Sequence, residues 1–309
     1  MAPTVTRIDA AGNTQLGEGP HWDPVSKTLY FVDIEGGTIH KYCPATNSST
    51  KASIDGHDGR SVSLIIPVKN QPNKFVISVD RDLGVVTWDG KSTKVSFEKI
   101  AEVDTAADVI GNRINDGKCD ASGRIWFGTI GVHDPKTMKF SENASFYSLH
   151  AGKPKHHFGD VTISNGLVWN KNNTKFYYID TPTQRVEVFD FDLATGNISN
   201  RKTLAELPKL GVIGGPDGMT IDTEDNLWVA VFDGACVLQV SGKDGKLMQK
   251  VDIPAKQITS VAWGGDNLDE LYVTSARLFD PALTAPVHGA VYKITNTGFK
   301  GFPMNEAVL

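Results

Sequence analysis

Residues 217–231 read DGMTIDTEDNLWVAV: a polar start, a turn of polar residues and an apolar strand that contains a tryptophan. Four further segments have the same order of features: EGPHWDPVSKTLYFVD at 18–33, NDGKCDASGRIWFGT at 115–129, NGLVWNKNNTKFYYID at 165–180 and SVAWGGDNLDELYVTS at 260–275. A weaker sixth copy, SLIIPVKNQPNKFVISVD, spans residues 63–80. The copies recur about every 48 residues, and a fixed period of this length indicates a repeat architecture.

The second half of each copy predicts a β-strand, because it is short and rich in β-branched and aromatic residues. Further strand candidates follow the copies at 39–42, 85–88, 145–149, 186–191, 237–240 and 290–294. About four strands in each period are typical of a propeller blade. The sequence therefore predicts an all-β fold, a six-bladed β-propeller that forms a single domain over residues 1–309. An irregular β-sandwich with chance similarity is the alternative, which six correctly spaced copies disfavour.

A ring of blades has to close, because open sheet edges invite association with other chains. We expect the N-terminal segment from Thr4 to Ile8 to pair with the strand near residues 291–294, so that the last blade contains both ends of the repeat region.

The composition restricts the partners of the protein. Lys and Arg total 31 against 36 Asp and Glu, a formal net charge of −5, and no stretch gathers the cationic residues. Nucleic acid and membrane are therefore not expected partners, and the patterns of the sequence lead us to expect neither a secretory signal nor a membrane-spanning segment. Three widely spaced cysteines favour neither a disulfide framework nor a thiolate metal site, so we expect a cytoplasmic protein. The sequence does not indicate an oligomeric state.

Equivalent positions of successive blades surround the axis of a propeller, so residues far apart in sequence converge there. The first residue of each copy carries an oxygen donor, and the six are Glu18, Ser63, Asn115, Asn165, Asp217 and Ser260. Carboxylate, amide and hydroxyl oxygens without sulfur or imidazole favour a hard divalent cation, first Ca²⁺, with Mg²⁺ and Mn²⁺ as alternatives. Each residue alone fits a turn, but two carboxylates in one channel are costly without a counter-ion. We expect a central metal-binding channel.

Two further features adjoin this ring. Arg113 lies two residues before Asn115 and would point to the same side of a strand, where it binds a substrate oxygen or pairs with Asp116; the sequence does not decide between these roles. The polar segment 131–143 follows a repeat strand, as a lid or binding loop does. Its His133 contacts a substrate or is an ordinary solvated loop histidine.

The motifs LGEGPHWD at 16–23, NRINDGK at 112–118, SNGL at 164–167, PDGMTID at 216–222 and NLDELYVTS at 267–275 resemble the regucalcin (senescence marker protein 30), gluconolactonase and luciferin-regenerating enzyme family. The similarity covers essentially the full length, keeps the order of the motifs and is greatest to the insect members. It implies a six-bladed propeller with one catalytic divalent cation.

Carried over to this sequence, the metal ligands of the family fall on Glu18, Asn165 and Asp217, and its substrate contacts fall on Arg113 and Asn115. One position departs from the pattern. Vertebrate members have an acidic residue after a Gly-Thr-Met run, whereas this chain reads GTIGVH at 128–133, with His133 in place of the acid. The resemblance therefore retains the metal ligands and leaves the preference for sugars open.

The resemblance and the ring together predict a metal-dependent lactonase, a gluconolactonase-like carboxylic-ester hydrolase. Its cation is expected to be Ca²⁺, with Zn²⁺, Mn²⁺ or Mg²⁺ as alternatives, and its partner is a small-molecule lactone of sugar-acid type. We assign Asp217 as the general base and Arg113, Asn115 and His133 as substrate contacts. The alternatives are regeneration of luciferin from an oxidised product and a non-enzymatic, regucalcin-like calcium-binding protein.

Overall fold

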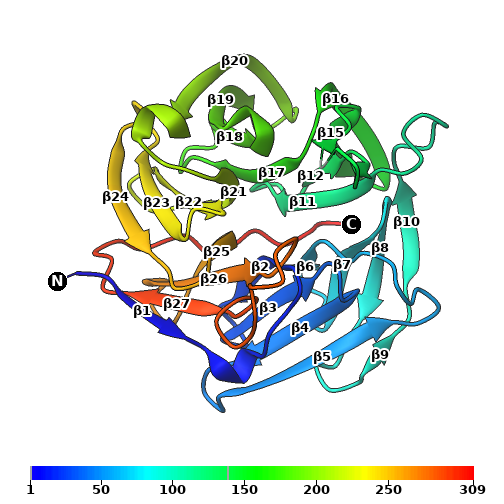
Figure 1. The fold of residues 1–309 in the computed structure, drawn as a ribbon. Coiled ribbons are helices and arrows are strands. Elements are labelled where there is room, and N and C mark those ends of the chain that lie inside the picture. Colours follow the sequence, from blue (N-terminus) through cyan, green and yellow to red (C-terminus); the bar gives the residue numbers. More distant parts are fainter. Residues whose placement is uncertain (1, 138) are drawn as a thin grey trace.

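A computed structural model describes residues 2–137 and 139–309, and its main sheets form a ring of six blades (Figure 1). Blade 1 contains β2 (Gly17–Asp23), β3 (Thr28–Asp33), β4 (Thr38–Cys43), β5 (Ser48–Ile54) and the short parallel strand β9 (Lys94–Val95). Blade 2 contains β6 (Ile65–Pro67), β7 (Lys74–Val79), β8 (Asp82–Thr87) and β10 (Glu98–Glu102). Blade 3 contains β11 (Arg113–Cys119), β12 (Ile125–Ile130), β15 (Ala144–His150) and β16 (Lys153–Val161).

The second half of the ring has the same plan. Blade 4 contains β17 (Ser164–Trp169), β18 (Lys175–Asp180), β19 (Arg185–Asp192) and β20 (Asn197–Glu206). Blade 5 contains β21 (Gly215–Ile221), β22 (Asn226–Phe232), β23 (Cys236–Ser241) and β24 (Leu247–Asp252). Blade 6 contains β25 (Gln257–Gly264), β26 (Glu270–Ala276), β27 (Tyr292–Thr295) and β1 (Thr4–Arg7). A two-stranded hairpin, β13 (His133–Asp134) and β14 (Lys139–Phe140), lies between β12 and β15.

The predicted propeller is confirmed, including the weak sixth copy, which forms β6 and β7 of blade 2. The apolar strand of each copy is the second strand of its blade, and β3, β12 and β26 are almost wholly buried. These strands have no polar alternation because neighbouring blades cover both of their faces.

The ring closes as predicted. Strand β1 pairs antiparallel with β27, with Thr4 opposite Thr295 and Arg7 opposite Tyr292. The C-terminal segment adds a second tie that the sequence did not suggest: it bridges Asp222 of blade 5 to Gly301 and Val68 of blade 2 to Ala307. It therefore crosses the ring between two blades that are far apart in sequence (Figure 1).

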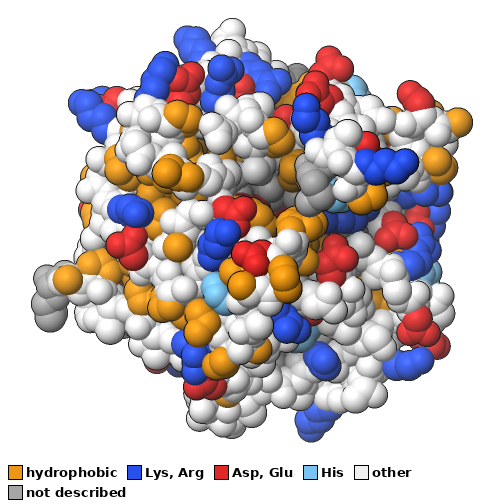
Figure 2. All heavy atoms as spheres, viewed as in Figure 1, with side chains coloured by type: hydrophobic (Ala, Val, Ile, Leu, Met, Phe, Trp, Pro, Cys, Tyr) orange, Lys and Arg blue, Asp and Glu red, His pale blue; other side chains and the backbone are white. Residues whose placement is uncertain are grey.

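The surface agrees with the charge pattern of the sequence. Acidic and basic side chains are interspersed on the face shown in Figure 2, with no continuous basic area. Within the described residues, no helix is long and apolar enough to span a membrane. Cys43, Cys119 and Cys236 are free thiols.

Inner strands carry β-bulges close to the polar residues that begin the copies. In β11 the pairing with β12 shifts between Ile114 and Gly117, so that Asn115 and Asp116 together lie opposite Gly128. Equivalent shifts follow Glu18 in β2 and Pro216 in β21. A bulge re-aims side chains relative to the regular alternation, and here it directs polar side chains toward the axis of the ring.

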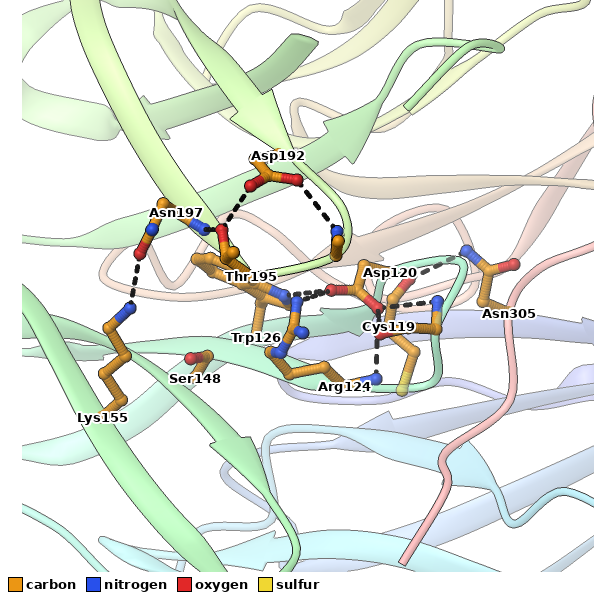
Figure 3. Close-up of polar contacts among 12 residues, drawn as sticks. Cys119, Asp120, Arg124, Trp126, Ser148, Lys155, Asp192, Thr195, Asn197 and Asn305 are labelled. Carbon is orange, nitrogen blue, oxygen red and sulfur yellow. Dashed lines mark hydrogen bonds and ion pairs between the residues drawn. The ribbon is translucent and has the colours of Figure 1, made fainter. Parts of the chain in front are cut away.

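Buried carboxylates fix the turns between the first and second strands. Asp120 accepts hydrogen bonds from the indole of Trp126 at 2.9 Å and from Arg124 Nη1 at 2.7 Å (Figure 3). Asp222 binds the indole of Trp228 at 3.0 Å in the same way. The tryptophans pack between blades, since Trp228 and Trp263 meet edge to face at 5.4 Å. The polar turn of each of these copies thus orients the aromatic residue that holds two blades together.

Asp120→Ala is expected to lower the free energy of unfolding by about 3–5 kcal/mol, because it leaves the buried guanidinium of Arg124 without its partner and the indole of Trp126 without an acceptor. Urea unfolding followed by circular dichroism measures the change. The control is Asp192→Ala, which removes an exposed carboxylate bonded to Ala194 N and Thr195 Oγ1 in a neighbouring turn (Figure 3). Equal losses in the two variants would contradict a special role for the buried turn.

Candidate functional site

One end of the central channel opens into a cavity of about 670 Å³. All six residues that the sequence assigned to the site line this cavity: Glu18, Arg113, Asn115, His133, Asn165 and Asp217. Glu18, Asn165 and Asp217 are buried and form its floor. They come from the inner strands of blades 1, 4 and 5, which the ring brings together.

Two members of the expected ring do not line the cavity. Ser63 Oγ donates a hydrogen bond to the backbone oxygen of Ile114 at 2.6 Å, which joins blades 2 and 3. Ser260 is buried against the backbone of Gly218, where an added Cβ would lie 2.1 Å from the serine Oγ. The prediction that both hydroxyls face the channel is therefore wrong, because these short side chains are used in the packing between adjacent blades.

The amide of Asn165 has a fixed orientation. Its Nδ2 donates to Thr181 Oγ1 at 2.8 Å, and its Oδ1 accepts from Asn115 Nδ2 at 3.1 Å. Thr181 in turn donates to the backbone oxygen of Pro216, the residue before Asp217. These bonds hold the amide oxygen on the cavity side, where it can act as a ligand. Thr181 was not anticipated from the sequence, since its role depends on contact between blades.

Arg113 is held beside the ring by Asn115. Its Nη1 donates to Asn115 Oδ1 at 2.7 Å and to the backbone oxygen of Ile114 at 3.1 Å. Among the described ion pairs none joins Arg113 to Asp116, which was one of the two roles that the sequence left open, and the contact with a substrate oxygen stays a prediction. The guanidinium lies against the cavity with donors available for an oxygen-bearing molecule.

The carboxylates of the floor strongly perturb one another. Burial and then the charge of Asp116 raise the pKa of Glu18 to about 8. Burial and then Glu18 and Asp116 raise the pKa of Asp217 well above its usual range. Glu18 Oε2 accepts only the backbone N–H of Gly19 among the described hydrogen bonds, at 2.9 Å. The charged forms of these carboxylates are therefore unfavourable, and the nearby Arg113 and Lys118 offset this only in part.

Asp116 and Lys118 belong to the same charge cluster, and sequence reasoning missed both in this role. They line a second cavity of about 380 Å³, which the C-terminal residues Phe302 and Pro303 also line. Asp116 Oδ2 is buried without a hydrogen-bond partner, and the ammonium of Lys118 donates to the backbone oxygen of Met219. The sequence did contain one indication of this role: Asp116 and Lys118 are two residues apart on an inner strand, a spacing that places side chains on the same face.

The floor residues fit a hard divalent cation. No three His, Cys, Asp or Glu side chains in residues 2–137 and 139–309 form a metal-binding group, and the candidate set consists of the carboxylates of Glu18 and Asp217 with the amide oxygen of Asn165. Such all-oxygen sets suit Ca²⁺, whereas structural zinc sites use sulfur and nitrogen ligands. The raised pKa values of Glu18 and Asp217 agree with this fit, since carboxylates that are buried and then crowded by other acids are stabilised either by protons or by a cation.

The expected lid segment lies at the mouth of the cavity. It forms the hairpin β13–β14, and Gly131, Val132, His133 and Phe140 line the cavity, while its residue 138 lies outside the described residues. The ring of His133 packs against Phe140 with centroids 4.7 Å apart and against Phe279 of blade 6 at 5.7 Å. His133 is therefore part of an aromatic cluster at the mouth and not a freely solvated loop residue.

Comparison with known proteins gives a consistent result. The sequence profile described as the SMP-30/Gluconolactonase/LRE-like region matches residues 16–277. Regucalcin of Danio rerio is 36% identical over 296 residues, which cover 94% of this chain and 93% of that protein. A solved luciferin-regenerating enzyme has a TM-score of 0.93 and 42% identity, with full coverage of both chains. A calcium-binding protein of Agrobacterium tumefaciens, also named regucalcin, has a TM-score of 0.82 and 29% identity over 98% of this chain and 96% of that one.

The cation-free protein is expected to lose stability as the pH rises from about 6.5 to 8. Folded Glu18 keeps its proton up to about pH 8, whereas an unfolded glutamic acid releases it near about 4.3. The folded state then holds more protons in this window, so the free energy of unfolding falls with pH. Glu18→Gln cannot titrate and should reduce the fall by on the order of 1–2 kcal/mol in urea titrations with a chelator present.

The pH range for this test starts at about 6.5, the ordinary pKa of histidine, because buried histidines have the opposite effect below it. Burial lowers the pKa of His21 and His40 to about 4, so these residues make stability rise with pH below about 6.5. The matched control is Glu35→Gln, an exposed carboxylate at the same cavity. A slope that Glu18→Gln leaves unchanged would contradict the assigned pKa.

Proposed function

The chain belongs to the SMP-30/Gluconolactonase/LRE-like family, and on that basis we propose that it is a divalent-cation-dependent hydrolase of lactones. The observation that carries the proposal is the polar floor of the larger cavity, where two buried carboxylates and an oriented amide oxygen lie beside a guanidinium. This arrangement combines ligands for a hard cation with donors for an oxygen-rich substrate.

Glu18, Asn165 and Asp217 would hold the cation, and Ca²⁺ is the proposed ion. The donor chemistry supports this choice, as does the description of the Agrobacterium tumefaciens relative as a calcium-binding protein. When a cation is bound there, the chemistry it supplies is Lewis-acid polarisation of the lactone carbonyl.

The protein residues divide the remaining tasks. Arg113, held by Asn115, binds an oxygen of the substrate and positions the ring. Asp217 accepts a proton from the water whose oxygen bonds to the carbonyl carbon. The ring carbon–oxygen bond then breaks, and the proton returns to the leaving oxygen, so that the lactone and water give one hydroxy acid.

Regeneration of a luciferin from its oxidised product is the second candidate. The solved luciferin-regenerating enzyme is similar to this chain over its full length, and the apolar mouth of the cavity suits a flat molecule. A calcium-binding role without catalysis is the third candidate, and turnover separates it from the other two.

Addition of Ca²⁺ after chelation is expected to raise the melting temperature of the wild type. Binding to the folded state alone adds about 2.7 kcal/mol of stability at a hundredfold excess over Kd. Glu18→Ala and Asp217→Ala should lose most of this gain, whereas Glu35→Gln, outside the floor, should keep it. The proposed site is wrong if the floor variants respond to Ca²⁺ as the wild type does.

Aldonolactones are expected to be converted to their acids only when a divalent cation is supplied. A pH-stat measurement of acid release with Ca²⁺, Mg²⁺, Mn²⁺ and Zn²⁺ tests this. Asp217→Asn should lower kcat by about 10²–10⁴-fold because it removes the proton acceptor, and Arg113→Ala should mainly raise KM. Calcium binding without acid release from any lactone would instead support the non-catalytic candidate.

A further inference from the structure

Three aromatic rings from two opposite blades meet above the polar floor of the larger cavity. His133 and Phe140 belong to the hairpin β13–β14 of blade 3, and Phe279 follows β26 in blade 6. The ring of His133 lies 4.7 Å from that of Phe140 and 5.7 Å from that of Phe279. In a six-bladed ring these two blades face each other, so the three side chains form an aromatic roof across the mouth.

Phe279 has an unfavourable conformation for its residue type. Its φ is 64°, in the left-handed region that bulky side chains rarely adopt. Its side chain is 63% exposed although it is large and apolar. Neither feature adds to the packing of the core, and strained residues of this kind concentrate at ligand sites. The loop is fixed, since Leu278 exchanges two hydrogen bonds with the side chain of Gln257.

The wall between floor and roof is largely apolar. Its hydrophobic members are Leu16, Ile34, Ile110, Ile130, Val132, Ile163, Phe232 and Leu278. Figure 2 shows hydrophobic side chains beside a hollow near the middle of the molecule. At about 670 Å³ the cavity is within the range of pockets that enclose drug-sized ligands.

Two of the charged groups of the wall, Asp80 and Arg81, are already engaged, whereas Glu35 is exposed to solvent at the rim. Asp80 accepts hydrogen bonds from Arg60 at 2.6 Å and from the backbone of Ser61 at 3.0 Å. Arg81 donates to Glu102 at 2.9 Å and to the backbone oxygen of Ile110 at 2.9 Å. A molecule with hydroxyl groups along its whole length would therefore leave several of them unpaired against this wall, which is costly.

We propose that the substrate is an amphipathic lactone, with its carbonyl end on the polar floor and a flat aromatic group or one of similar apolar size under the roof. Phe279, with Phe140 and His133, is then the specificity determinant. This inference rests on the proposed lactonase function and names its substrate class. The aromatic group stacks against the roof and removes the exposed face of Phe279 from water.

The test compares two five-membered lactones, γ-phenyl-γ-butyrolactone and an aldono-1,4-lactone, through the ratio of their kcat/KM values. The wild type should favour the phenyl lactone. Phe279→Asn, which suits the left-handed backbone, should lower the ratio by about tenfold through the loss of ring contact and apolar burial. Val25→Asn is the control, because Val25 is 89% exposed in the turn between β2 and β3. An unchanged ratio in Phe279→Asn, or a wild-type preference for the aldonolactone, would overturn the inference.

A binding measurement separates this inference from the proposed reaction. Calorimetry with γ-phenyl-γ-butyrolactam, which resists hydrolysis, needs no turnover. If neither lactone is hydrolysed with any cation, the lactonase proposal fails. The aromatic roof is still supported in that case if the wild type binds the lactam and Phe279→Asn binds it about tenfold more weakly. Lactam affinity that is absent in the wild type, or equal in wild type and Phe279→Asn, refutes the roof whatever the hydrolysis assay shows.

Discussion

The bulge in the inner strands is the constraint on which the site depends. A regular strand would send consecutive side chains to opposite faces of its blade, and polar residues such as Asn115 would then enter the contacts between blades. The bulge in β11 instead places Asn115 and Asp116 together opposite Gly128. Asn115 lines the larger cavity and Asp116 the smaller one, so one irregularity supplies polar groups to both ends of the channel.

The same geometry imposes an electrostatic cost. The carboxylates of Glu18, Asp116 and Asp217 gather at the axis, and the ammonium of Lys118 lies at the end that opens into the smaller cavity. Burial raises the pKa of all three acids, and repulsion between carboxylates adds to this at Glu18 and Asp217. The folded chain therefore tolerates this cluster at the expense of stability. The offsetting energy comes from elsewhere, in the closed ring of sheets and in tryptophan contacts between blades such as that of Trp228 with Trp263. The charged residues lie at the axis, and the contacts that stabilise the fold lie between the blades around it. The fold can therefore contain a charged site and remain stable.

Repetition explains why so much could be predicted from the sequence. A strand such as β22 is indicated by its own apolar residues, and the period of the copies brings Glu18, Asn165 and Asp217 to one axis without knowledge of any contact. Ser63 shows where this reasoning stops, because a hydroxyl equivalent by position bonds to the next blade and not to the channel. Asp116 shows a second limit, since the direction of a side chain at a bulge depends on the partner strand. The contact of His133 with Phe279 joins loops of opposite blades, and no local pattern indicates it.

Floor and roof of the cavity are built from different kinds of element, and this has a consequence for specificity. The floor residues lie on paired inner strands, whose hydrogen bonds fix their positions relative to one another. The roof lies on a short hairpin and on the loop after β26, which can change in sequence without moving the floor. In such an arrangement the specificity of a site can change through the roof while its floor stays the same. His133 illustrates the point, because its contacts with Phe140 and Phe279 lie in the roof, whereas Glu18, Asn165 and Asp217 lie on the inner strands.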